Sequence, residues 1–174
     1  MLPDLYPARL HLMVLPRPLR RQVTNTTIAH LALRSPLRVL DGGNHFDAHG
    51  IARDLRRKTH HLKPALERIQ VARAFTCYQV ISLLGDSALV TLPTLVLDLL
   101  TTFYDENVAL PERLRLLQLC LEQLRRLSRL APVIVTSTPR LEGQADELLE
   151  RLEAGADQTW HFEMETPKPE LRLF

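Results

Sequence analysis

An acid, Asp98, and a set of three arginines in this sequence are of types that do chemistry in proteins. Asp98 is the one acid in the otherwise apolar run 93–100, and in parallel α/β sheets ligands bind beyond the carboxyl ends of the strands. Arg17, Arg20 and Arg21 precede a segment of helical pattern, where guanidinium groups suit a phosphate. For the arginines, the alternative is a solvated loop that binds no phosphate. For Asp98, the alternative is a structural carboxylate that is held by backbone N–H groups or by Thr26.

Two further clusters of ionisable residues follow. His45 and His49 flank Asp47, but they lie around an expected turn and no third metal ligand is evident. The segment 49–60, which we expect to be helical, carries a basic group that suits nucleic-acid phosphates, with a solvated helix face as the alternative: Arg53, Arg56, Arg57 and Lys58. Cys77 and Cys120 are too far apart in the sequence for metal-ligand spacing, which indicates free thiols.

The elements that must position these residues alternate between strands and helices. Apolar runs predict strands at 10–15, 38–41, 69–72, 93–100, 132–137 and 159–164. Helical periodicity predicts helices at 24–33, 49–60, 77–84, 111–130 and 142–152. The basic, proline-containing segment 17–22 is expected to be a loop, with Thr24, Asn25 or Thr26 capping the helix after it. This alternation predicts an α/β fold with a mostly parallel central sheet that is covered on both faces.

The composition is that of an ordinary globular chain. It has 174 residues, 45% of them apolar, and a formal net charge of +2. We therefore expect one domain over residues 1–174. The sequence has no apolar run of membrane-spanning length and no signal-peptide pattern at its start, which favours a cytoplasmic protein with no membrane partner. Its nineteen arginines against three lysines are explained by base composition or heat adaptation.

The order of these motifs resembles the RecA-type P-loop ATPase core, in its recombinase and KaiC-like branch. The resemblance covers roughly residues 10–165 and rests on four stretches: Val39–Asp47, the ARAF-like Val71–Phe75, the Walker B-like Leu95–Asp98 and the sensor-like Val133–Thr136. It implies a three-layer RecA-like fold. It also implies a nucleotide site, whose residues would be Arg20, Arg21, Asn25, Thr26, Thr27, Asp98 and Thr136, with Thr26 and Asp98 as Mg²⁺ ligands.

The same resemblance shows where the phosphoryl-transfer machinery is lacking. In register with the family, the phosphate loop falls at residues 19–27, and it requires glycine at 19 and 24 and lysine at 25. This sequence has Leu19, Thr24 and Asn25 there. Gly43 stands where the catalytic glutamate would be, and a glycine cannot activate water. ATP hydrolysis by the usual mechanism is therefore not expected.

The resemblance implies a setting in DNA recombination or repair. Of the two loops that bind DNA in recombinases, the counterpart of the first, 101–107, carries two acids, and the second, Thr138–Arg140, is followed by an acidic stretch. Our leading hypothesis is a non-hydrolysing RecA-like paralogue, a degenerate-Walker-A pseudo-ATPase that needs no cofactor and binds or scaffolds itself or an active RecA-like relative. The alternatives are a Mg-ATP-binding ATPase with an unorthodox loop, and a DNA-binding module that uses no nucleotide.

Overall fold

One parallel sheet forms the middle of the molecule. The computed structural model describes residues 9–86, 91–140 and 146–164. The strands are β1 (Leu10–Val14), β2 (Leu37–Asp41), β3 (Ile69–Arg73), β4 (Thr94–Leu97), β5 (Val133–Ser137) and β6 (Gln158–His161). They pair in the order β3-β2-β4-β5-β1-β6, and every pairing is parallel. Their carboxyl ends therefore meet at one edge of the sheet.

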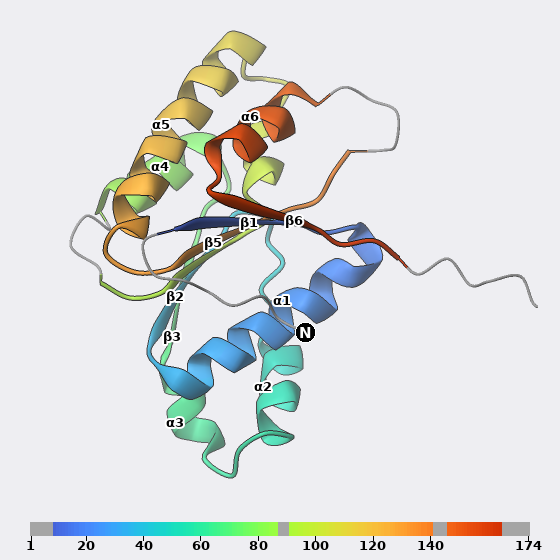
Figure 1. Cartoon of the computed structure of the whole chain (residues 1–174), viewed down its shortest axis with the longest axis vertical. Coiled ribbons are helices and arrows are strands. Elements are labelled where there is room, and N and C mark those ends of the chain that lie inside the picture. The colour runs from blue at the N-terminus through green and yellow to red at the C-terminus, as the bar shows by residue number, and fades with distance from the viewer. Residues whose placement is uncertain (1–8, 87–90, 141–145, 165–174) are drawn as a thin grey trace, which may run out of the picture.

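Helices cover both faces of this sheet. One face carries α1 (Arg17–Arg34), α2 (Ala48–Arg56) and α3 (Leu62–Glu67), and the other carries α4 (Cys77–Asp86), α5 (Leu110–Ser128) and α6 (Glu147–Gly155) (Figure 1). A 3₁₀ turn, η1 (Leu99–Phe103), follows β4. The predicted fold class is confirmed: this is a three-layer α/β arrangement around a parallel sheet, consistent with a RecA-like one.

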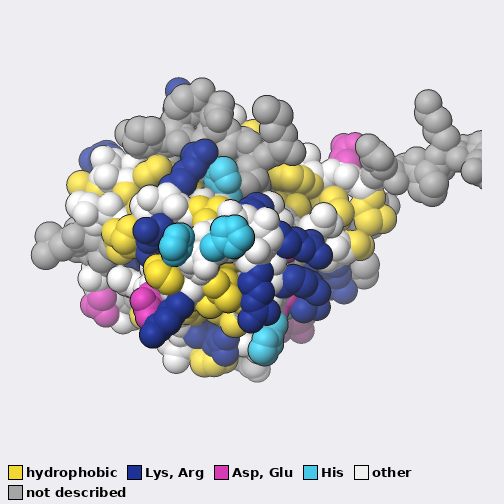
Figure 2. All heavy atoms as spheres, turned by 90° about the horizontal axis from the view of Figure 1, so that it is seen from below, with side chains coloured by type: hydrophobic (Ala, Val, Ile, Leu, Met, Phe, Trp, Pro, Cys, Tyr) yellow, Lys and Arg dark blue, Asp and Glu magenta, His cyan; other side chains and the backbone are white. Residues whose placement is uncertain are grey.

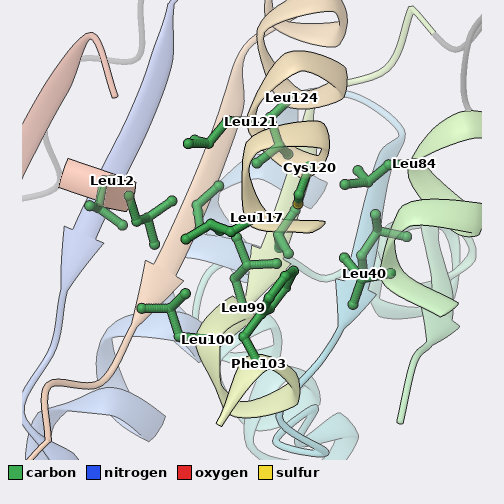
Figure 3. Close-up of a cluster of buried hydrophobic side chains, with 14 of the residues drawn as sticks. Leu12, Leu40, Leu84, Leu99, Leu100, Phe103, Leu117, Cys120, Leu121 and Leu124 are labelled. Carbon is green, nitrogen blue, oxygen red and sulfur yellow. The ribbon is translucent and has the colours of Figure 1, made fainter. Parts of the chain in front are cut away.

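Each side of the sheet has its own apolar core. Leu12, Leu40 and Val96 project to one side, where they pack with residues of α4, α5, α6 and η1, and Figure 3 shows Phe103 and Leu117 in this cluster. Met13, Val39 and Leu95 project to the other side and pack against α1, α2 and α3. Because neighbouring strand residues alternate between two buried faces, β1, β4 and β5 are buried along their whole length.

The start of the first helix differs from the prediction. The segment 17–22 is not a loop: α1 begins at Arg17, seven residues before the predicted start at Thr24. Pro16 is the N-cap and Pro18 lies in the first turn, where a missing N–H costs no hydrogen bond. The prolines, taken as loop signals, are therefore compatible with the helix start, and only Leu15 and Pro16 separate β1 from α1.

Other boundaries shift by smaller amounts. The strand predicted at 93–100 ends at Leu97, because Asp98 adopts a left-handed backbone conformation (φ 47°) and η1 follows it. The helix predicted at 49–60 ends at Arg56, and α3 after it was not predicted. The helix predicted at 142–152 corresponds to α6, but residues 142–145 lie outside the described ranges. No described helix has both the length and the apolar character to cross a membrane.

Candidate functional site at the carboxyl edge of the sheet

Asp98 lies at the centre of the sheet's carboxyl edge. It follows β4, is only 3% exposed, and joins the end of β4 to the end of β5. Its backbone N–H donates to the Thr136 hydroxyl (2.8 Å), and its Oδ1 accepts a hydrogen bond from the Thr138 N–H (2.8 Å). The backbone N–H partner that the sequence offered as an alternative to Mg²⁺ is thus present. Thr136, a predicted nucleotide-site residue, lies directly beside Asp98.

The second oxygen of Asp98 faces two side chains from other elements. Arg20, on α1, donates from Nη1 to Oδ2 at 3.0 Å, and Nε2 of His45 lies 3.3 Å from the same oxygen. Burial lowers the pKa of His45 below its usual value of 6.5, and the positive charge of Arg20 lowers it further. His45 is therefore neutral at pH 7, and Arg20 is the cation that balances Asp98.

Asp41, at the end of β2, is fully buried and holds the turn that follows it. Its carboxylate accepts hydrogen bonds from the N–H groups of His45 (2.8 Å) and Phe46 (3.1 Å) and from Nε of Arg73 (3.2 Å). Asn44, within this turn, has a positive φ of 56°. These contacts fix the loop that presents His45 to Asp98. Gly43, at the position of the family's catalytic glutamate, lies against both: a Cβ there would come within 2.8 Å of Asp98 Cβ.

The remaining predicted phosphate ligands lie within α1 rather than in a loop. Arg21 and Asn25 donate to Oδ2 of Asp47 at 2.6 and 3.0 Å, and the Thr27 hydroxyl donates to its own helix, at the Val23 carbonyl. The Thr26 hydroxyl donates to Asp54 on α2 (3.4 Å). The two predicted Mg²⁺ ligands thus have different partners: Thr26 contacts Asp54, and Asp98 contacts Arg20. Within the described ranges, no group of three or more His, Cys, Asp or Glu side chains is placed to hold a metal ion.

Asp47 joins α1 to α2. It caps α2 by accepting from the Gly50 N–H (3.0 Å), and the Arg21 guanidinium, with this N–H, holds its pKa well below the usual range. Gly50 is buried where the two helices meet, and a Cβ there would collide with the Asn25 amide and the Asp47 carboxylate. The close contact between α1 and α2 therefore depends on a glycine at this position.

A basic groove runs between these two helices. It encloses about 610 Å³ and is lined by Pro18, Arg21, Gln22, Asn25, Thr26, Arg53, Asp54, Arg57 and Lys58. Three of the four residues predicted to contact nucleic acid line it, and the fourth, Arg56, is exposed on the same helix. Figure 2 shows the face that carries α2 and α3, where Lys and Arg side chains gather together with histidines.

The two segments matched to recombinase DNA loops contact each other. Arg140 stacks over the Tyr104 ring at 4.5 Å, and the Tyr104 hydroxyl donates to Asp146, the N-cap of α6. Burial and the Asp146 carboxylate raise the pKa of Tyr104 well above its usual value. Residues 141–145, with the start of the acidic stretch, lie outside the described ranges.

Sequence reasoning missed how these residues combine. It offered Arg20 as a phosphate ligand and gave His45 no role, whereas both contact Asp98, which is 78 residues from Arg20 in the sequence. No local spacing signals a pairing of that range. A scan against protein-family models finds no match to this chain, and a search of curated proteins finds no relative. The RecA-like resemblance thus stays a prediction. The fold is compatible with a RecA-like family but does not identify one.

Proposed function

We propose that this protein is a non-hydrolysing, RecA-like binding or scaffold protein that acts in DNA recombination or repair. The observation that carries the proposal is the ion pair between Arg20 and Asp98. Asp98 is the strand-end acid that would help to hold Mg²⁺ in an active relative, and here a side chain of this chain supplies its counter-charge. A metal ion there would have to displace that guanidinium.

The path of the backbone supports the same conclusion. A nucleotide's phosphates need a loop whose N–H groups point inward, and a lysine that reaches the terminal phosphates. In α1 the backbone N–H groups beyond the first turn are used within the helix, and residues 19–26 all lie in that helix. Asn25, at the lysine position, is buried and donates to Asp47. A function that requires neither Mg²⁺ nor ATP fits this arrangement best.

The partner in this proposal is a second copy of the chain or an active RecA-like relative. The supporting feature is β3, which forms one edge of the described sheet and pairs only with β2 there. Val71 on this strand is 43% exposed, and Phe75 just after it is 67% exposed. An edge strand beside exposed apolar side chains is a surface that another chain can cover.

Phosphate release tests the non-hydrolysing part of the proposal. The wild-type protein with Mg-ATP, with and without duplex DNA, should release no more phosphate than an Asp98→Asn variant does. Release by the wild type that Asp98→Asn abolishes would overturn the proposal in favour of an ATPase with an unorthodox loop.

Sedimentation tests the partner. A Val71→Thr/Phe75→Ser variant should self-associate more weakly than the wild type, because both changes remove apolar surface at the β3 edge. Leu130→Ser is the matched control, since Leu130 is also half-exposed but follows α5. A wild type that is monomeric at every concentration would exclude self-association and leave the active relative as the partner.

A further inference from the structure

We infer that the groove between α1 and α2 binds the phosphate backbone of duplex DNA. The inference goes beyond the proposed loss of ATP hydrolysis and does not depend on it. Charge is distributed very unevenly along the chain. Residues 17–68, which include both helices of this groove, contain eleven Lys and Arg against four Asp and Glu, a net charge of +7. The overall charge of +2 thus conceals a strongly basic segment of the chain, and four of its cations line the groove: Arg21, Arg53, Arg57 and Lys58.

The cations of the groove are available to a ligand. Arg53, Arg57 and Lys58 are exposed, and in the described part of the chain none of them forms an ion pair with a carboxylate. Arg53 and Arg57 lie one helical turn apart, about 6 Å along the helix. Guanidinium groups in such a row suit successive phosphates, because each offers a fork of donors to two oxygens. Gln22 and Thr26, also in the lining, add groups that can donate hydrogen bonds.

The lining also indicates which polymer fits. It contains no aromatic side chain, and single strands bind largely by stacking their bases on aromatic rings. All the large apolar residues found exposed in the described ranges, such as Val71 and Leu130, fall outside residues 17–68. A protein partner or a membrane surface would need apolar anchors there. A duplex, which is recognised through its phosphates, needs only the cations and donors that are present.

One carboxylate in the groove opposes this ligand and gives the inference a sharp test. Asp54 lies among the cations, and its carboxylate accepts a hydrogen bond from the Thr26 hydroxyl (3.4 Å). Asp54→Asn should therefore tighten DNA binding, by about fivefold for one charge removed near a phosphate. A general loss of fold cannot produce a gain in affinity.

The experiment is a fluorescence anisotropy titration of a labelled duplex of mixed sequence into the full chain. Three cations predict a slope of log K against log salt of about −2.7, which is about a 40-fold loss of affinity between about 50 and about 200 mM salt. Arg53→Ala/Arg57→Ala should weaken binding and reduce the slope to about −0.9. The matched control is Arg126→Ala/Arg129→Ala, which removes the same charge at the end of α5, on the other face of the sheet.

Four results would overturn the inference. The first two are no binding of duplex at low salt and an equal loss of binding in the Arg126→Ala/Arg129→Ala control. The third is an unchanged affinity for duplex in Asp54→Asn. The fourth is a preference for single-stranded DNA, anionic vesicles or a poly-glutamate peptide over the duplex. Melting temperatures of all variants within a few degrees of the wild type would show that folding is intact, as expected for exposed side chains.

Discussion

Replacing Arg20 with alanine should destabilise the protein measurably, because it removes the cation that balances a buried carboxylate. Asp98 is 96% buried as a side chain and Arg20 is 24% exposed. A hydrogen bond to a charged group contributes about 1.5–3 kcal/mol to stability. Thr138 and His45 still contact Asp98 in the variant, and water can reach the vacated space, so we expect a loss near the lower limit, about 1–2 kcal/mol.

Urea denaturation and thermal melting measure this loss. For a chain of this size, 1–2 kcal/mol corresponds to a fall in melting temperature of about 2–8 °C. Arg17→Ala is the matched control, because Arg17 is exposed on the first turn of the same helix, and its effect should stay within about 0.5 kcal/mol.

A double-mutant cycle separates the ion pair from other effects of the substitution. Arg20→Ala combined with Asp98→Asn should give a coupling energy of about 1 kcal/mol, whereas Arg17→Ala combined with Asp98→Asn should be additive within about 0.5 kcal/mol. Equal destabilisation by Arg20→Ala and Arg17→Ala, or a coupling near zero, would refute the assignment of Arg20 as the partner of Asp98.

Two further predictions concern the same side of the molecule. Gly50→Ala should destabilise the protein by about 1–3 kcal/mol in urea denaturation, because the new Cβ would collide with Asn25 and Asp47. Gly85→Ala, which has open space around it in α4, is the control and should be neutral or stabilising. Stabilisation by Gly50→Ala would contradict the packing described. Because the pKa of His45 is lowered in the folded protein, the unfolded chain binds this proton first as the pH falls, and the free energy of unfolding should decrease below about pH 6.5. His45→Asn should make this decrease shallower. An unchanged pH dependence of stability in the variant would refute this role of His45.

The layered fold was predictable because its signals are local. β4 and β5 are continuous apolar runs, as expected of parallel strands that are buried on both faces, and α5 carries leucines at helical spacing. The start of α1 was predicted wrongly because Pro16 and Pro18 are compatible with both a loop and a first helical turn, and only packing against the sheet decides between them.

The chemistry of the site was less predictable, because it depends on contacts between distant segments. Asp98 was singled out in the sequence by its place at the end of an apolar run, but Arg20 and His45, which contact its Oδ2, come from α1 and from the turn after β2. The groove between α1 and α2 could not be predicted, because its lining comes from both helices and depends on how they pack. Only the basic run at 53–58 was visible in the sequence. The role of Gly50 became apparent only from the distance to Asn25 and Asp47 across the two helices.

If Arg20 occupies the place of a nucleotide's metal ion, as we propose, Mg-ATP should leave the melting temperature of the protein unchanged. A ligand at about 100 times its dissociation constant adds about 2.7 kcal/mol of stability, or roughly 5–11 °C for a chain of this size. We predict no shift at millimolar Mg-ATP compared with Mg²⁺ alone. A saturable increase that Asp98→Asn removes would contradict this proposal and show that this edge of the sheet binds nucleotide.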